Sequence, residues 1–215
     1  MAKDKKIAPS CFRTLEPGES RELIMRHGSH KDNILTDEAI RQAMATGAAL
    51  AASGVKIDNC VSSPSPRAIR TCLAAQEGYK KMMYIKTEPA LSDLAYYHAD
   101  KAADLKAHME SLGRKWCDPD MAKTIFDDSD VYFPVGMSLA LDAKRGFAQN
   151  ALLGKTTFIT THGVGRIEPG IILLRGERIH IPERLVETGQ IIELILDASS
   201  NIVEKNWLET IVPAQ

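Results

Sequence analysis

The sequence has no apolar run near the roughly 20 residues that a membrane-spanning helix requires. Its first ten residues are polar and rich in lysine, so no secretory signal is expected there. Its four cysteines form neither a C-x-x-C pair nor a metal-like spacing with histidine, which favours buried thiols over a metal site. Together these absences favour a protein of the reducing cytoplasm that binds neither a membrane nor a metal.

Neither sign of charge dominates, because 27 lysines and arginines face 28 aspartates and glutamates, and the formal net charge is −1. The basic residues are scattered, which disfavours binding to nucleic acid. The 215 residues, 44% of them hydrophobic, suffice to bury a core. We expect one domain over residues 21–215. A tail over residues 1–20 precedes it, because that segment lacks periodicity and contains two prolines and a glycine.

Short β-rich segments alternate along the chain with longer segments of helical periodicity. Strands are expected at 22–27, 57–63, 82–87, 155–161, 189–196 and 202–207, and helices at 36–53, 66–76, 100–112, 138–153 and 166–175. Thr36 and Ser138 are expected as N-caps, and Gly54, Gly78 and Gly154 as helix-ending residues. The alternation predicts an α/β fold, a three-layer sandwich with a mainly parallel central sheet, one antiparallel edge strand and helices on both faces.

Three polar segments follow predicted strands at the point where each strand ends. Arg26-His27-Gly28 closes the first strand, Ser62–Arg67 joins the second strand to its helix, and Thr161-His162-Gly163 closes the strand at 155–161. In parallel sheets, ligands collect just beyond the carboxyl ends of the strands. The three segments are therefore expected to meet at one edge of the sheet, although they lie far apart in the sequence.

The side chains of these segments have the charge and geometry of a phosphate site. An arginine offers a planar fork of donors to phosphate oxygens, and Arg67 would add the positive end of its helix. A neutral imidazole is a competent nucleophile near pH 7, and a second imidazole, His162, can donate to a phosphate oxygen. Such a site requires no metal or other cofactor. An isolated arginine–histidine pair is ordinarily a solvated surface feature, so only the combination of segments favours catalysis.

These motifs, with two others, resemble the histidine phosphatase superfamily in the branch that contains phosphoglycerate mutase. The matching strings are R-H-G at 26–28, L-T-D-E-A-I-R-Q-A at 35–43, S-S-P-S-P-R-A-I-R-T at 62–71, G-M-S-L at 136–139 and T-H-G at 161–163. The resemblance covers about residues 22–207. Ala39 stands where the family usually has glycine, and Met137 where it usually has glutamate, with Arg145 as the later arginine.

The resemblance implies roles for individual residues. His27 would be the phosphorylated nucleophile, and Arg70 would be a surface residue near the site. Asp93, in the string Leu91-Ser92-Asp93, takes the position of the family's acidic proton donor, with Glu88 as the alternative. The phosphate would be bound by the remaining motif residues, Arg26, Asn33, Arg67, His162 and Gly163.

The activity that the resemblance implies is metal-independent hydrolysis of phosphomonoesters through a phosphohistidine on His27. Only seven residues separate His27 from Leu35, where the mutases carry a longer insertion, and this favours a phosphatase over a mutase. Three alternatives stay open: phosphoglycerate mutase-type phosphoryl transfer, a phosphohistidine protein phosphatase, and a non-catalytic phospholigand-binding module.

The expected partner is a small phosphorylated substrate or a phosphoprotein. The sequence does not determine which substrate, nor the oligomeric state, although the strand at 82–87 is a candidate edge for pairing between subunits. A pocket wall is expected within residues 92–135. The aromatic residues of that region, more typical of core packing than of a ligand wall, are Tyr96, Tyr97, Trp116, Tyr132 and Phe133.

Overall fold

A computed structural model describes residues 3–8, 11–94, 99–115, 118–126, 132–163, 166–178 and 185–209. Within these residues, seven strands form one sheet in the order β1-β9-β8-β2-β7-β5-β6, and a separate hairpin pairs β3 with β4. The strands are β1 (Lys3–Lys6), β2 (Ser20–Arg26), β3 (His30–Lys31), β4 (Ile34–Leu35), β5 (Asn59–Ser62), β6 (Ile85–Thr87), β7 (Thr156–Thr161), β8 (Ile191–Leu196) and β9 (Ile202–Glu209).

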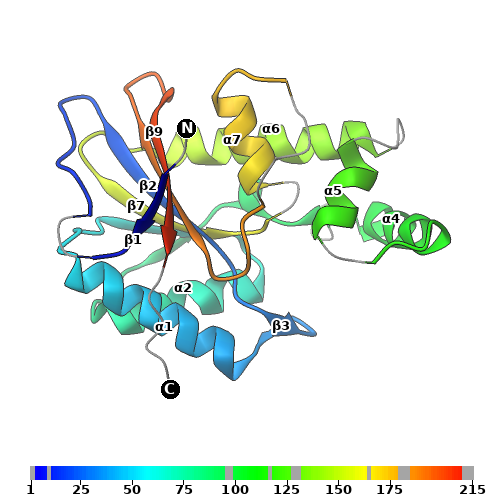
Figure 1. Ribbon diagram of the computed structural model, residues 1–215, viewed down its shortest axis with the longest axis horizontal. Coiled ribbons are helices and arrows are strands. Elements are labelled where there is room, and N and C mark those ends of the chain that lie inside the picture. The colour runs from blue at the N-terminus through cyan, green and yellow to red at the C-terminus, as the bar shows by residue number, and fades with distance from the viewer. Residues whose placement is uncertain are drawn as a thin grey trace.

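Helices cover both faces of the sheet. On one face lie α1 (Asp37–Ala52) and α2 (Pro66–Tyr79), and on the other lie α6 (Phe133–Asn150) and α7 (Ile167–Leu174) (Figure 1). The helices α4 (Ala99–Ser111) and α5 (Asp118–Phe126) lie beyond the sheet, next to the N-terminal end of α6. A short 3₁₀ helix, η1 (Pro89–Leu91), follows β6. No helix in the described part of the chain has the length and apolar character to cross a membrane.

The sheet is mainly parallel. Parallel pairing runs from β2 through β7 and β5 to β6, and β1 is parallel to β9. Within this seven-stranded sheet the antiparallel strand is β8, which lies between β9 and β2 on the β1 side. The predicted α/β sandwich, with a mainly parallel sheet between two helical layers, is confirmed.

Burial on both faces explains why the central strands show no alternation of buried and exposed residues. From Ser20 to Met25 every residue of β2 is buried. Leu23 and Met25 pack in the core cluster under α1 and α2, whereas Ile24 packs in the cluster under α6 and α7. A strand covered by helices on both sides has no solvent face, so its sequence does not alternate.

Helix α1 begins and ends where the sequence predicted. The side chain of Thr36 accepts the backbone N–H of Ala39, and Asp37 and Glu38 occupy the first turn, where negative charge is favourable. Just past the end, Gly54 has a φ of +79°, a left-handed conformation that glycine adopts without strain.

Helix α2 continues past the residue that was expected to end it. Ser65 and Pro66 begin the helix as predicted, but Gly78 lies inside it and the end comes at Lys80 in the left-handed region. A Cβ on Gly78 would lie 1.8 Å from the carbonyl oxygen of Met44 in α1. Gly78 therefore allows the two helices to cross closely, and the prediction of a helix-ending glycine there is wrong.

Helix α6 begins five residues before the expected cap, Ser138, which lies inside the helix. Pro134 occupies the first turn, where its missing N–H is not needed. The helix ends at Asn150 rather than at Leu153, and Gly154 instead forms a turn with a φ of +69° before β7.

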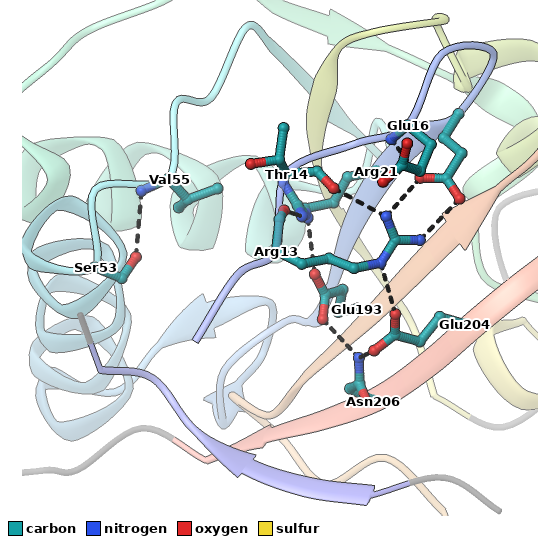
Figure 2. Close-up of polar contacts among 10 residues, drawn as sticks. Arg13, Thr14, Glu16, Arg21, Ser53, Val55, Glu193, Glu204 and Asn206 are labelled. Carbon is teal, nitrogen blue, oxygen red and sulfur yellow. Dashed lines mark hydrogen bonds and ion pairs between the residues drawn. The ribbon is translucent and has the colours of Figure 1, made fainter. Parts of the chain in front are cut away.

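The first 20 residues contribute to the sheet, contrary to the expectation of a tail. Strand β1 pairs with β9 from Lys3 to Lys6. Arg13 then binds Glu19 through both terminal nitrogens. Its Nε donates to Glu204 of β9 (Figure 2). No periodic pattern marks this strand in the sequence, because the strand is four residues long and lies at an edge. At the opposite edge the strand predicted at 82–87 is reduced to Ile85–Thr87.

Candidate active site

The three motif segments meet at one edge of the sheet. The ends of β2 and β7 lie in register, with Arg26 opposite Thr161, and β5 pairs with the other side of β7. The backbone N–H of His27 donates to the carbonyl of Thr161 at 2.9 Å. The rings of His27 and His162 consequently lie 4.9 Å apart between centroids. The parallel pairing of three strands thus brings residues separated by 135 positions, His27 and His162, into one cluster.

His27 is buried, and its two ring nitrogens have different partners. Nδ1 lies 2.8 Å from the carbonyl oxygen of Gly28, which can only accept, so Nδ1 carries the proton. Nε2 receives the Nε–H of Arg67 at 3.1 Å, as an unprotonated nitrogen does. The lone pair of His27 therefore faces the centre of the cluster.

Burial keeps the His27 imidazole neutral. Desolvation lowers the pKa of His27 to about 3, and the positive charges of Arg67 and Arg26 act in the same direction, whereas the bond to Gly28 partly opposes them. A neutral imidazole with an unprotonated Nε2 is the nucleophilic form.

Thr71 holds the loop that carries His27 against α2. Its hydroxyl accepts the backbone N–H of Gly28 at 3.1 Å and donates to the carbonyl of Arg67 at 2.8 Å. A Cβ on Gly28 would lie 2.6 Å from the Cβ of Ala39, so the loop reaches this position only with glycine.

Arg67 is the hub of the cluster. It occupies the second position of α2 and contacts acceptors on four separate loops. Besides its bond to His27, the guanidinium donates to Asn33 Oδ1, forms an ion pair with Asp93, and lies 3.3 Å from Nδ1 of His162. Arg67 thus contacts four other predicted site residues, His27, Asn33, Asp93 and His162.

Asn33 reaches the cluster from the hairpin of β3 and β4. Asp32 and Asn33 have φ values of 51° and 65°, and two successive left-handed residues form the tight turn typical of two-residue hairpins. This turn directs the Asn33 side chain toward Arg67.

Of the two candidate acids, Asp93 lies in the cluster and Glu88 does not. Besides its ion pair with Arg67, Asp93 Oδ2 lies 3.9 Å from Nδ1 of His162. Glu88 caps η1 instead, since its Oε1 accepts the backbone N–H of Ala90 at 3.2 Å. Of the two, only Asp93 therefore lies within contact of the residues around His27.

His162 is buried at the back of the cluster, with Nε2 2.9 Å from the hydroxyl oxygen of Ser63. Desolvation holds the pKa of His162 well below its usual range, and the positive charges of Arg67, Arg166 and Arg26 lower it further. Like His27, this imidazole is neutral near pH 7.

Arg26 and Gly163 pack against each other at the edge of the cluster. A Cβ on Gly163 would lie 2.9 Å from the guanidinium of Arg26, so the glycine provides the space that the arginine occupies. Arg26 Nη1 donates to the carbonyl of Val186 at 2.8 Å, which fixes the direction of the side chain.

Three residues of the site were not predicted from the sequence. The His30 ring lies 5.2 Å from that of His27, and Ser63 contacts His162. Arg166 is fully buried, and its Nη1 donates to the carbonyls of Ala90 and Leu139 at 3.0 and 2.6 Å. The available signals were their short spacings from the motif histidines and the position of Ser63 within the S-S-P motif.

Several predicted neighbours lie away from the cluster. Arg70 is exposed, as expected, and Arg145 forms a surface ion pair with Asp142 at 2.8 Å. Tyr132 packs in the core cluster of α4 and α5, and Phe133 is partly exposed at the start of α6. Tyr96, Tyr97 and Trp116 lie outside the described residues. Within the described part of the chain, no group of three or more His, Cys, Asp or Glu side chains is arranged to hold a metal ion.

Comparison with known proteins agrees with this arrangement. The family model described as histidine phosphatase superfamily (branch 1) matches residues 18–125. The ecdysteroid-phosphate phosphatase of Drosophila melanogaster is 41% identical over 73 residues, which are 33% of this chain and 10% of that protein. This chain thus matches only about a tenth of the length of that relative.

Solved structures share the fold over most of the chain. A phosphoglycerate mutase from Bacillus anthracis has a TM-score of 0.60 at 13% identity, covering 91% of this chain and 93% of its own. YhfR from Bacillus stearothermophilus gives 0.58 at 18% identity, covering 90% and 96%. The mycobacterial glucosyl-3-phosphoglycerate phosphatase Rv2419c gives 0.57 at 16% identity, covering 87% and 96%. At these identities the likeness shows the fold alone.

Proposed function

This chain belongs to the histidine phosphatase superfamily (branch 1), and we propose that it hydrolyses phosphomonoesters without a metal, through a phosphohistidine formed on His27. One observation carries the proposal. The Nε2 atom of His27 is unprotonated, because Nδ1 donates to Gly28, and it faces Arg67 at 3.1 Å. A nucleophilic nitrogen beside a phosphate-binding cation is the arrangement that phosphoryl transfer to histidine requires.

The first step begins when the substrate phosphate displaces the present acceptors from Arg67. A phosphate dianion offers the guanidinium two oxygens in a bidentate geometry, which a single carboxylate oxygen of Asp93 does not. His27 Nε2 then attacks phosphorus in line, forming the N–P bond while the P–O bond to the leaving group breaks. Asp93, once the phosphate has replaced it on Arg67, takes up a proton from solvent and donates it to the departing oxygen. Arg26, Arg67 and His162 stabilise the phosphoryl oxygens.

The second step regenerates the enzyme. Water attacks phosphorus from the side the leaving group vacated, and the Asp93 carboxylate accepts its proton. The N–P bond breaks, the electron pair returns to His27 Nε2, and inorganic phosphate leaves. The same carboxylate thus serves as acid and then as base.

The tight hairpin favours water over a retained second substrate as the acceptor. A two-residue turn joins β3 to β4 beside the nucleophile, so this segment supplies no long loop to hold a phosphorylated intermediate in place. We propose small organic phosphates as the substrate class. The names of the ecdysteroid-phosphate and glucosyl-3-phosphoglycerate phosphatases, which share sequence or fold with this chain, support that class.

The test is turnover of p-nitrophenyl phosphate in the presence of EDTA, between pH 5 and 8. The wild-type protein is expected to hydrolyse the ester in EDTA, and His27→Ala to be inactive. Arg70→Ala is the matched control, because Arg70 is exposed and lies one turn from Arg67 on α2. Loss of activity with EDTA, restored by a divalent cation, would contradict the metal-independent mechanism. Transfer of phosphate only to a second organic acceptor would instead identify a mutase.

A further inference from the structure

Ser63 lies directly behind His162 in a rigid, fully buried position. Its backbone N–H donates to the carbonyl of Thr160 at 2.9 Å, and its own carbonyl accepts the hydroxyl of Ser62 at 2.8 Å. The Ser63 hydroxyl oxygen accepts the backbone N–H of Ser65 at 3.2 Å and lies 2.9 Å from Nε2 of His162. One lone pair and one proton of this hydroxyl thus remain for the histidine.

The other ring nitrogen of His162, Nδ1, faces Arg67 and Asp93. Nδ1 lies 3.3 Å from Arg67 Nη2 and 3.9 Å from Asp93 Oδ2. Because burial keeps this imidazole neutral, it carries one N–H only. The proton can lie on the side of Ser63 or on the side of the phosphate, but not on both.

The Arg67 contact and a bound phosphate require opposite tautomers of His162. Arg67 has only donors, so Nδ1 accepts from it and the proton lies on Nε2, which donates to Ser63. A bound phosphate dianion has only acceptors, so Nδ1 must then carry the proton. Nε2 in that state needs a donor, and a hydroxyl can rotate to provide one whereas a carbonyl or carboxylate cannot.

We propose, on the basis of the proposed function, that Ser63 is a positioning residue whose hydroxyl reverses its hydrogen bond with His162 when phosphate binds. This reversal places the single proton of a neutral His162 on Nδ1, directed at the phosphoryl group. Ser63 touches neither the substrate nor the nucleophile, and it acts only through His162.

Removal of the Ser63 hydroxyl is expected to abolish the contribution of His162 to the reaction. In Ser63→Ala the Nδ1–H tautomer leaves Nε2 buried without a donor, so this tautomer becomes disfavoured. The phosphoryl oxygens then lose one N–H at the moment their charge is being stabilised. We expect kcat to fall roughly tenfold to a hundredfold, with KM changed far less.

The direct test is nitrogen NMR of the full chain labelled at histidine, free and saturated with vanadate as the phosphate probe. In the wild type, the His162 proton is expected on Nε2 in the free protein and on Nδ1 in the complex. In Ser63→Ala we expect the His162 proton not to move from Nε2 to Nδ1 when vanadate binds. Ser20→Ala is the matched control, because Ser20 is equally buried and its hydroxyl has no partner among the described residues. Ser20 is also the first residue of β2, at the end of that strand far from His27.

The outcomes separate this proposal from the proposed function. A wild-type His162 that keeps its proton on one nitrogen in both states, or a Ser63→Ala variant that exchanges like the wild type, overturns the role of Ser63. Exchange lost in Ser63→Ala and kept in Ser20→Ala supports it. If the wild type binds vanadate and exchanges but hydrolyses no phosphomonoester, the role of Ser63 stands and the proposed activity fails.

Discussion

Arg67 donates its Nε–H to Nε2 of His27 across 3.1 Å. The same guanidinium pairs through Nη2 with the carboxylate of Asp93. In the proposed mechanism, the nucleophile and the acid are thus both held by the side chain that binds the substrate. In that mechanism the phosphate exchanges these contacts for its own, which releases both groups for reaction.

Substitution of Arg67 tests this hub. Arg67→Ala is expected to lower kcat/KM by about a hundredfold or more, because it removes the bidentate contact to phosphate. Arg70→Ala, on the exposed face of the same helix, should stay near the wild-type value. Steady-state kinetics on both variants decides the matter, and equal losses in the two would show that charge alone, rather than the position of Arg67, is responsible.

Asp93 should matter most for substrates whose leaving group needs a proton. Asp93→Asn is expected to slow hydrolysis of an alkyl phosphate by about 10²–10⁴-fold, but to affect p-nitrophenyl phosphate much less, because nitrophenolate leaves without help. Glu88→Gln is the control, since Glu88 caps η1 outside the cluster. The ratio of the two substrates in each variant is the measurement. A uniform loss on both substrates in Asp93→Asn would contradict an acid role.

The buried histidines predict a loss of stability in acid. The pKa of His27 is about 3 in the folded protein against 6.5 unfolded, so both states are neutral above pH 6.5 and the unfolded state binds the proton first below it. His27 alone should cost about 2 kcal/mol of stability at pH 5 relative to pH 7.

This loss is measured by urea unfolding at pH 7, 6 and 5. His27→Gln cannot titrate, and the other groups are unchanged, so the variant should lose less stability over this range than the wild type. Equal slopes in both proteins would show that His27 is not held neutral by the fold.

The two histidine motifs were predictable because each one follows a strand that can be recognised in the sequence. R-H-G follows the apolar run of β2 and T-H-G follows β7, so the parallel topology alone brings His27 and His162 together. The contacts of Arg67 were not predictable, because they depend on the positions of side chains on four separate loops. The same holds for Arg166, whose burial between two carbonyls arises only from the packing of α7.

Gly78 illustrates the limit of local signals. A glycine near the end of a helical pattern is ordinarily a terminator, and only the crossing of α1 and α2 gives it another role. A Cβ there would lie 1.8 Å from a backbone oxygen, which a rotamer change cannot relieve.

Gly78→Ala should therefore lower the free energy of unfolding by about 1–3 kcal/mol, although alanine is the better helix former. Glu77→Ala, at the adjacent exposed position, should be near neutral. Chemical denaturation of both variants is the measurement, and a stabilised Gly78→Ala would contradict the close crossing.

The central claim is a covalent phosphohistidine on His27, and rapid quenching tests it most directly. The protein is mixed with a radiolabelled phosphomonoester, quenched in alkali to preserve phosphohistidine, and digested for peptide mapping. We expect label on the peptide that contains His27, released by acid, and none in His27→Ala. Steady turnover without labelled His27, or with the label on another residue, would contradict the account.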